Sequence, residues 1–403
     1  MKSYEEYDNL LDYGHDFLSQ GSSNIYKYLE ALSGDFWSCK KLLTYGRPFN
    51  FVTSERSVGK STNIAMFLLL EWIYNGRKFI YCRRDKDTIQ LTGPKFFDNA
   101  VKILNEKMPK LDKNFRQIVQ MELQGGKYLF SNSITFEDED DEEGHPDTVE
   151  IGYTIPLSLE AKSKSTPFGD VFNIVFDEFL ERDPSKYLGN KQTMEFAEYE
   201  AIMSLYESVD RCIGRSYRNE TRIFFLGNIK TKFCPLYLVM GMAEYVVSGA
   251  KFIAPKGKFW LMERVDGIEA TKGKEQSFAY QMATEDHRKY AFSTDTAEDQ
   301  SFVKKPGATE YIETVRIDGK DYGIRMGLNQ IVPEMYVGKP EPTRRIIALD
   351  NGSHDGIDYQ LISAWRTFPL TKRMAEMYQK GLLFFDNEYT KQVFLKYLQF
   401  LDT

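Results

Sequence analysis

The stretch VTSERSVGKSTNI, residues 52–64, decides the fold class of this chain. It contains GKS at 59–61, the end of the phosphate-loop pattern G-x-x-x-x-G-K-[ST], but Ser54 stands where that pattern has its first glycine. A phosphate loop needs inward-facing backbone N–H groups, a lysine for the β- and γ-phosphates and a hydroxyl for Mg²⁺ at a helix N-terminus. GKS supplies the parts that tolerate no substitute, whereas a small serine can replace the first glycine. Arg56 either adds charge at the phosphates or faces solvent. We predict a site for ATP and Mg²⁺ formed by Ser54, Arg56, Gly59, Lys60, Ser61 and Thr62, with Ser61 as a metal ligand.

The residues around this loop have the pattern of a βαβ unit. PFNFVTS (48–54) is an apolar strand, STNIAMFLLLEWIYNG (61–76) is helical in period and ends on a glycine, and KFIYCRR (78–84) is a second strand. Strand, helix and strand in this order build a parallel sheet. The sequence therefore predicts an α/β fold with the loop at the carboxyl end of a strand.

Two later strands end on polar residues that suit hydrolysis. VFNIVFDEF (171–179) is almost entirely apolar until Asp177 and Glu178, which is the pattern of the Walker B strand of P-loop ATPases. Asp177 would hold Mg²⁺ through water, and Glu178 would orient and deprotonate the attacking water. Asn228, at the end of RIFFLGN (222–228), is either a polar sensor near the γ-phosphate or a turn residue.

Length and composition fit a chain of two globular domains. The 403 residues exceed the usual size of one core, and 42% hydrophobic with 14% aromatic residues can build sizeable cores. A formal charge of −7 argues against a uniformly basic nucleic-acid coat but permits a local basic channel. The four cysteines lack CxxC spacing, so neither a zinc site nor a disulfide framework is predicted. We expect no membrane-spanning segment, because the apolar runs are too short or carry a glutamate.

We expect four segments along the chain. Residues 1–45 have the pattern of a helical N-terminal extension, 46–260 of a P-loop ATPase domain, 261–300 of a linker region and 301–403 of a small α/β domain. The last domain is predicted from period-two alternation on both sides of a DG turn, a further short strand and a helical C-terminus.

Acidic residues outside the Walker B strand raise the question of metal sites. EDEDDEE (137–143) lies between two strand-like stretches and is either an exposed hairpin loop or a metal cluster. A two-metal nuclease in the last domain would need converging carboxylates. Glu313 can point inward from its strand, but Asp318 lies in a turn. The other candidates, which turn chemistry also explains, are Asp350 at a strand end and Asp355, Asp358 and Asp386.

Four blocks of sequence carry a family resemblance. They are KFIYCRRDK (78–86), YTIPLSLEAKSKSTPFGDVFNIVFDEF (153–179), RIFFLGN (222–228) and KGLLFFDN (380–387). In this order they resemble the DNA-packaging (encapsidation) ATPases of φ29-like tailed bacteriophages, which are related to large terminases. The resemblance implies an additional-strand (ASCE) P-loop ATPase domain with a mostly parallel sheet, followed by an RNase H-like domain that is a vestigial nuclease. Ser54 is a departure from the family pattern.

The resemblance also implies partners and further site residues. The chain would form a homo-pentameric ring in the host cytoplasm, transiently docked on the portal of the prohead, with or without a structural RNA, and would thread double-stranded DNA. Arg211 aligns with the family's trans-acting arginine, with Arg215 and Arg218 as rivals in this longer segment. Lys164 aligns with a second trans-acting cation. Cations that could contact DNA phosphates on a pore surface are Arg83, Arg84, Lys86 and Lys95, the first two with a structural role at the strand end as the alternative.

Two rival functions stay open at this point. A large terminase with an active C-terminal nuclease would also cut DNA, whereas a nucleotide-dependent switch would leave Glu178 idle. DNA-stimulated ATP turnover separates a motor from a switch, and metal-dependent cleavage of plasmid identifies a terminase.

Overall fold

The computed structural model divides into two compact units. The first comprises Met1–Leu188, Glu198–Leu236 and Ser248–Ala297, and the second Gly189–Ala197, Tyr237–Val247 and Glu298–Thr403. In the part of the chain that is described, no helix is both long enough and apolar enough to cross a membrane. The structure describes residues 24–133, 148–159, 168, 170–181, 188, 197–211, 220–229, 234–242, 245–246, 250–266, 276–284, 288, 302–317, 320–328, 332–341, 346–348, 358–359 and 368–398.

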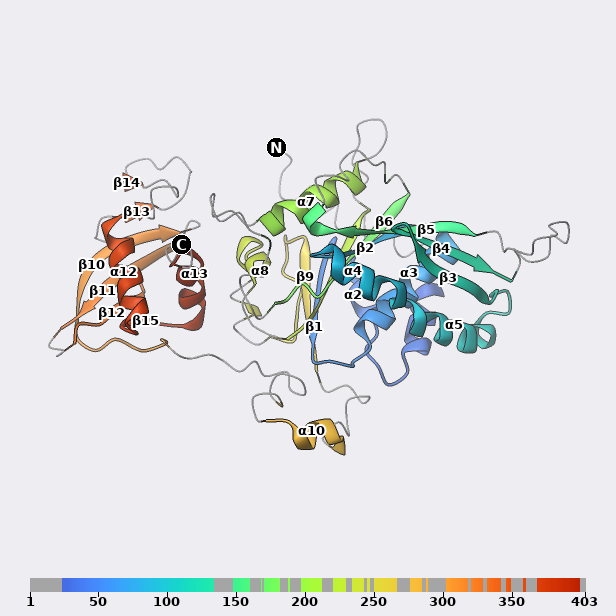
Figure 1. The fold of residues 1–403 in the computed structure, drawn as a ribbon, viewed down its shortest axis with the longest axis horizontal. Coiled ribbons are helices and arrows are strands. Elements are labelled where there is room, and N and C mark those ends of the chain that lie inside the picture. Colours follow the sequence, from blue (N-terminus) through green and yellow to red (C-terminus); the bar gives the residue numbers. More distant parts are fainter. Residues whose placement is uncertain are drawn as a thin grey trace. The chain divides into compact units, whose positions relative to one another are not determined.

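A nine-stranded, mostly parallel sheet forms the centre of the first unit (Figure 1). Its strand order is β3-β4-β5-β2-β6-β7-β1-β9-β8. The six strands from β5 to β9 in this order are parallel, and both ends of the sheet are antiparallel. The strands are β1 (Phe49–Ser54), β2 (Lys78–Arg83), β3 (Ile118–Gln124), β4 (Lys127–Asn132), β5 (Val149–Pro156), β6 (Val171–Asp177), β7 (Arg222–Asn228), β8 (Phe252–Ile253) and β9 (Trp260–Val265).

The helices of this unit include the predicted helix after the phosphate loop. That helix, α3, ends at Asn75 and is capped by Gly76, whose φ of 65° is the left-handed conformation that favours glycine. It contacts both β2 and α5. Residues 24–33 are also helical. The helices are α2 (Lys40–Thr44), α3 (Lys60–Asn75), α4 (Lys86–Thr92), α5 (Asp98–Leu111), α7 (Ala197–Asp210) and α10 (Phe278–Met282), with 3-10 turns η1 (Gly93–Lys95) and η2 (Leu157–Leu159). The division between the two units falls within α8 (Pro235–Val239).

Strand register brings the polar strand ends to one edge of the sheet. β7 lies between β1 and β6, with Ser54 opposite Asn228 and Asp177 opposite Leu226. β2 flanks β6 on its other side, with Cys82 opposite Phe176. Because parallel strands end at the same edge, the phosphate loop, the Walker B acids and the end of β2 lie along one line.

Two predicted domain boundaries differ from the structure. The described part of the predicted N-terminal extension is not separate, because Leu29, Leu32 and Trp37 are buried in the core that contains α3. The backbone N–H of Trp37 also donates to the carbonyl of Val58 in the phosphate loop at 3.1 Å. The predicted boundary at residue 260 falls at the start of β9, which pairs in parallel with β1. Both differences come from contacts between residues that are distant in sequence.

The second unit has a six-stranded sheet with its own core. Its strand order is β14-β13-β10-β11-β12-β15, and the predicted hairpin is the antiparallel pair β10–β11. Met374 of α12 and Phe394 of α13 are fully buried in the core of this sheet. The elements are β10 (Thr309–Ile317), β11 (Lys320–Gly327), β12 (Met335–Gly338), β13 (Ile346–Ala348), β14 (Asp358–Tyr359), β15 (Leu383–Phe385), α12 (Pro369–Gln379) and α13 (Glu388–Leu398).

Candidate nucleotide-binding and hydrolysis site

The phosphate loop turns through two left-handed residues before α3 begins. Ser57 has a φ of 66° and Gly59, the N-cap of α3, a φ of 90°. A Cβ atom on Gly59 would lie 3.0 Å from the Cβ of Phe36. Gly59 is therefore required both by its backbone conformation and by the close approach of Phe36. The turn leaves the first N–H groups of the 16-residue helix α3 as a site for an anion.

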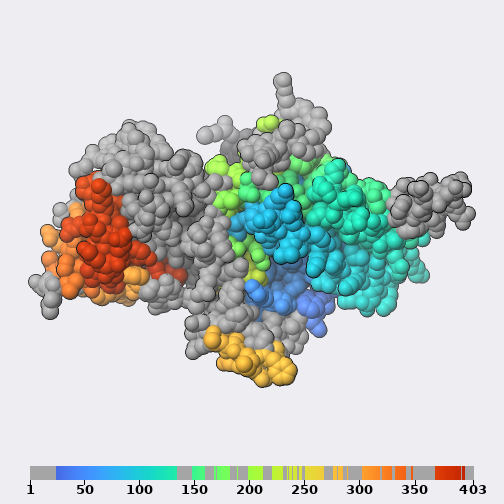
Figure 2. All heavy atoms as spheres, viewed as in Figure 1, coloured from blue at the N-terminus to red at the C-terminus, as the bar shows by residue number. Residues whose placement is uncertain are grey.

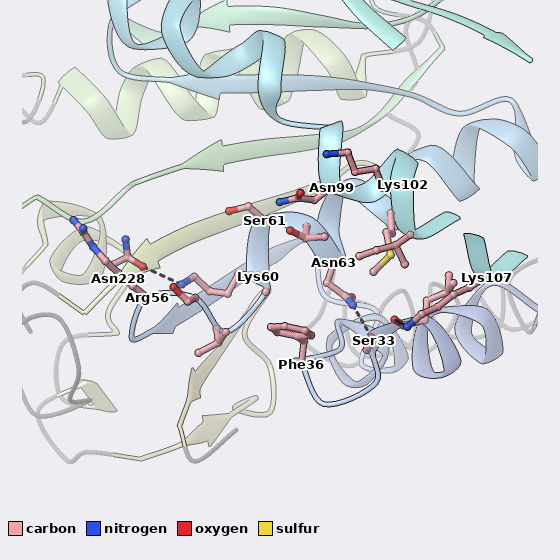
Figure 3. Close-up of a pocket in the computed structure, with 17 residues that line it drawn as sticks. Ser33, Phe36, Arg56, Lys60, Ser61, Asn63, Asn99, Lys102, Lys107 and Asn228 are labelled. Carbon is pink, nitrogen blue, oxygen red and sulfur yellow. Dashed lines mark hydrogen bonds between the residues drawn. The ribbon is translucent and has the colours of Figure 1, made fainter. Parts of the chain in front are cut away.

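Lys60 lies in the first turn of α3 and is buried, with 7% of its surface exposed. Its ammonium donates to the hydroxyl of Ser54 and to the Glu55 carbonyl at 3.5 Å. It also donates to the Asn228 amide oxygen at 3.2 Å (Figure 3). The sequence left Asn228 open between a sensor and a turn residue, and the structure places its side chain on the lysine of the loop. Ser54, Lys60 and Asn228 thus form one cluster at the ends of β1 and β7.

A cavity of about 750 Å³ extends from this cluster to the N-terminal segment. In Figure 3, Lys60, Arg56 and Asn228 lie at one end, and Phe36, Ser33 and Lys107 at the other. The volume is within the range of small-molecule sites, which is about 300–1,000 Å³. The lining residues are Leu32, Ser33, Phe36, Arg56, Ser57, Val58, Gly59, Lys60, Ser61, Thr62, Asn63, Met66, Asn99, Lys102, Ile103, Lys107 and Asn228.

The sequence did not predict the part of the cavity that the N-terminal segment lines. Phe36 is 51% exposed although its neighbour Trp37 is buried, so its ring is available at the cavity wall. Asn63 fixes this wall, because its side chain accepts from the Cys39 N–H at 2.9 Å and donates to Ser33 at 2.6 Å. A polar asparagine on the apolar face of a predicted helix was the available signal.

Residues of α5 form another side of the cavity. α5 continues through Pro109 to Leu111. Lys102, which is exposed, and Lys107, which is partly buried, both line the cavity. The Lys107 ammonium donates to the Leu32 carbonyl at 3.3 Å.

The predicted Walker B acids, Asp177 and Glu178, lie at the end of β6 and are held by residues at the end of β2. Asp177 accepts from Arg83 at 2.6 Å and from the Tyr81 hydroxyl at 3.1 Å. Burial and the charge of Asp177 raise the pKa of Tyr81, which therefore stays a neutral donor. Glu178 has a φ of 59°, a conformation uncommon outside glycine that concentrates at functional sites. Its carboxylate is 3.2 Å from Arg83.

The oxygen groups at this edge suit Mg²⁺. Mg²⁺ prefers oxygen ligands and usually takes one or two protein groups besides water and phosphate. The Asp177 carboxylate ends β6, and the Ser61 hydroxyl lies in the first turn of α3, two strands away at the same edge. The predicted metal pair therefore fits the donor chemistry.

Comparison with known proteins assigns the family. The model of the Podovirus DNA encapsidation protein (Gp16) family matches residues 33–126 and 144–400. The chain belongs to this family. The DNA packaging protein of Bacillus phage phi29 is 22% identical over 362 residues, which cover 89% of this chain and 95% of the relative. The DNA packaging protein of Bacillus phage B103 is also 22% identical, over 357 residues, 87% of this chain and 97% of that relative.

Solved structures share the fold. A chain of the bacteriophage Phi-29 viral genome packaging motor assembly superposes with a TM-score of 0.60 at 20% identity, covering 91% of this chain and 99% of its own length. A chain of the Phi-28 gp11 DNA packaging motor gives a TM-score of 0.57 at 17% identity, covering 91% and 98%. The mixed α/β architecture with a large, mostly parallel sheet is thus common to this chain and these motor proteins.

In this member of the encapsidation family, two of the four predicted DNA contacts are buried. Arg84 donates to both carboxylate oxygens of Glu198 at 2.8 Å, and to the carbonyl of Glu178 at 2.7 Å. Arg83 and Arg84 are 9% and 8% exposed, so both guanidinium groups are committed to internal ion pairs. This burial favours the alternative role that the sequence left open for them, a structural one at the strand end, and a contact of either with DNA stays a prediction. The arginines turn inward because β2 is buried and because Asp177 and Glu198 lie within ion-pair distance of its end.

The other two predicted contacts are on the surface. Lys86, the first residue of α4, and Lys95 are both exposed. Figure 2 shows α4 in light blue on the surface of the first unit. Arg211 is exposed directly after α7. Lys164, Arg215 and Arg218 lie outside the described residues, as does the acidic run 137–143, although the strands on either side of that run form the predicted antiparallel pair.

The acids of the second unit do not form a described metal cluster. Glu313 of β10 is half-buried and Asp386 follows β15. Within the described residues, no three His, Cys, Asp or Glu side chains come together in a way that could hold a metal ion. Asp318, Asp350 and Asp355 lie outside those residues, and nothing is described of the Asp358 side chain, so the absence of nuclease activity stays a prediction.

Proposed function

We propose that this chain is an ATP-hydrolysing motor that translocates double-stranded viral DNA into a preformed capsid. The observation that carries the proposal is the convergence of the phosphate loop, Lys60 and Asn228 with the Walker B acids at one sheet edge, in a member of a DNA encapsidation family. The position of β7 between β1 and β6 supports an additional-strand (ASCE) P-loop domain.

In this proposal the cavity beside the loop receives the nucleotide. The N–H groups at the start of α3 bind the phosphates, and Lys60 exchanges Ser54 for a phosphate oxygen. The nucleoside lies against the exposed ring of Phe36, between the N-terminal segment and α5. Aromatic rings bind bases by stacking, which requires no particular hydrogen-bond pattern.

Hydrolysis is assigned to the end of β6. Ser61 and Asp177 would hold Mg²⁺, which supplies charge neutralisation for the phosphates when it is bound. Glu178 accepts a proton from the attacking water. Asn228 keeps Lys60 in reach of the γ-phosphate, and Arg211 of a neighbouring subunit, with Lys164 as a second cation, stabilises the charge of the transition state.

DNA contact is assigned to exposed cations near α4. Lys86 and Lys95 would meet backbone phosphates without reading bases, so binding would weaken as salt rises. The motor is proposed to work as a homo-pentameric ring docked transiently on the portal of the prohead in the host cytoplasm. A structural RNA is a further proposed partner.

The second unit is proposed to be a vestigial RNase H-like nuclease. Its strand order β12-β11-β10-β13-β14, with β11 antiparallel and β13 parallel to β10, supports this fold. A large terminase with an active nuclease is the alternative, and Asp350 is the acid that the sequence favours for it, because it follows the apolar run of a predicted strand.

One experiment tests the proposed function. ATP turnover by the full chain is measured with and without double-stranded DNA, and plasmid is incubated with the same protein and Mg²⁺ or Mn²⁺. A motor hydrolyses ATP, is stimulated by DNA and leaves the plasmid intact. ATP binding without turnover would indicate a switch, and plasmid cleavage that Asp350→Ala abolishes would indicate a terminase.

A further inference from the structure

Asn63 of α3 joins the two ends of the turn that carries Phe36. Its Oδ1 accepts from the backbone N–H of Cys39 at 2.9 Å, and its Nδ2 donates to the hydroxyl of Ser33 at 2.6 Å. Because the Cys39 N–H can only donate, it fixes which amide atom faces it. Between the two ends, the Phe36 N–H donates to the Ser33 carbonyl at 3.0 Å. A single side chain of α3 therefore holds the turn of residues 33–39 in place.

The side chain of Asn63 is buried and engaged at both of its polar atoms, whereas the ring of Phe36 is exposed at the cavity wall. Ser33 is also buried, and its hydroxyl donates in turn to the Leu29 carbonyl. A buried polar group that loses its partner is costly, so the amide keeps its two bonds to the turn. Asn63 therefore acts on a ligand in the cavity through the turn, and Phe36 is the exposed residue of the turn that lines the cavity.

The same turn is docked on the phosphate loop. The backbone N–H of Trp37 donates to the Val58 carbonyl at 3.1 Å, and a Cβ on Gly59 would lie 3.0 Å from that of Phe36. In addition, the buried indole of Trp37 donates to Glu263 of β9 at 3.1 Å. The ring of Phe36 is therefore held in a fixed position relative to the N-terminus of α3, which is the site for an anion.

We propose that Asn63 is a positioning residue that sets the affinity of the site for a nucleobase, by holding Phe36 where its ring stacks on the base of a nucleoside triphosphate. The inference rests on the proposed nucleotide site. α3 carries both determinants, because the phosphates would bind at its first residues, Lys60–Thr62, and Asn63 follows within the same turn. Binding groups that are built on one helix keep their spacing better than groups on loops. Asn63 would thus favour a ligand with a base at the correct distance from its phosphates over inorganic tripolyphosphate, which has no base.

Asn63→Ala tests this with two ligands, a non-hydrolysable ATP analogue and inorganic tripolyphosphate, each titrated into the full chain with Mg²⁺ in a calorimeter. The dissociation constant for the analogue is expected to rise by up to about tenfold, which is the loss expected for Phe36→Ala itself. The dissociation constant for tripolyphosphate should not change, because the phosphate loop and Lys60 are intact.

Asn105→Ala is the matched control. Asn105 of α5 also holds a separate segment with both atoms of its amide, because it donates to the Ile118 carbonyl and accepts from the Ile118 N–H, each at 2.8 Å. It does not line the cavity. This variant should lose stability in thermal unfolding, as Asn63→Ala does, but keep the wild-type affinity for both ligands.

A double-mutant cycle with Phe36→Ala separates positioning from a general loss of structure. If Asn63 acts through Phe36, the double variant should bind the analogue no more weakly than Phe36→Ala alone. Losses that multiply would show that Asn63 acts independently of the ring and would overturn the inference. An equal loss of affinity for tripolyphosphate would overturn it too, because a disturbed phosphate loop predicts that result.

The outcomes also separate this inference from the proposed function. A wild-type chain that binds neither ligand overturns both. If Phe36→Ala weakens binding of the analogue and Asn63→Ala does not, the inference alone fails. If Asn63→Ala does not fold, Ser33→Ala decides, because it removes one of the two bonds to the turn and keeps the bond to Cys39. Wild-type affinity for the analogue in Ser33→Ala would then count against the inference.

Discussion

Lys60 donates a hydrogen bond to the hydroxyl of Ser54, the residue in the place of the first glycine of the phosphate loop. Ser54 is fully buried, and its hydroxyl donates in turn to the Glu55 carbonyl. The serine is therefore more than a small substitute for glycine, because it gives the ammonium an internal partner. A nucleotide phosphate must draw Lys60 away from this partner.

Removal of this partner should strengthen nucleotide binding. Ser54→Ala is expected to bind ATP at least about tenfold more tightly, because a hydrogen bond to a charged group contributes about 1.5–3 kcal/mol and is broken on binding. Titration of a fluorescent ATP analogue measures the affinity, and Lys60→Ala, which should lose binding, is the control. Weaker binding by Ser54→Ala would mean that the hydroxyl itself contacts the nucleotide.

Gly59 offers a test of loop geometry with a matched control. Gly59→Ala should destabilise the chain and weaken ATP binding, since it combines a φ of 90° with a contact of 3.0 Å to Phe36. Gly76→Ala has a φ of 65° and nothing within 4 Å, so it should show only the conformational cost of about 1–2 kcal/mol. Thermal unfolding and the ATP titration compare the two. Equal losses of stability and affinity would show that the Phe36 contact is irrelevant.

Glu178→Gln separates ATP binding from hydrolysis. The amide keeps the shape of the side chain but cannot accept a proton from water, so turnover should fall by about 10³-fold while ATP still binds. Single-turnover hydrolysis and the binding titration are the two measurements. Residual turnover near the wild-type rate would exclude Glu178 as the base, and a loss of binding would place it in the nucleotide site instead.

Phe36 should affect the affinity for ATP and not the rate of ATP hydrolysis. Stacking of a base on an aromatic ring contributes about 1–3 kcal/mol, so Phe36→Ala should raise the dissociation constant for ATP about tenfold and leave the rate at saturation unchanged. Tyr45→Ala is the control, because Tyr45 is also a partly exposed aromatic residue, 43% exposed, but does not line the cavity. If both variants bind ATP like wild type, the nucleoside lies elsewhere.

The fold around the loop was predictable because its signals are local. β1, β2, β6 and β7 are short apolar runs that end on polar residues, and the glycine at the end of α3 has the expected left-handed conformation. Together they place Lys60, Asp177 and Asn228 at one sheet edge before any coordinates are known. The family assignment confirms the resemblance that these blocks carried.

What could not be predicted depends on contacts between distant residues. Arg83 meets Asp177 across 94 positions and Arg84 meets Glu198 across 114, and no sequence pattern tells a buried arginine from one that faces DNA. The Phe36 side of the cavity depends likewise on the packing of residues 24–45 against α3.

The remaining prediction concerns Arg211, which is exposed directly after α7. α7 is anchored at its first turn by the buried pair of Glu198 and Arg84, so its far end can present an arginine to a neighbouring subunit. Because an arginine that stabilises the γ-phosphate in the transition state contributes about 10³–10⁵ in rate, Arg211→Ala should bind ATP but lose DNA-stimulated turnover. Mixing this variant with Lys60→Ala should restore part of the turnover, since a Lys60→Ala subunit can lend its arginine to a neighbour with an intact loop. Co-assembled rings that show no rescue at any mixing ratio would argue against action between subunits, and normal turnover by Arg211→Ala alone would shift the role to Arg215 or Arg218.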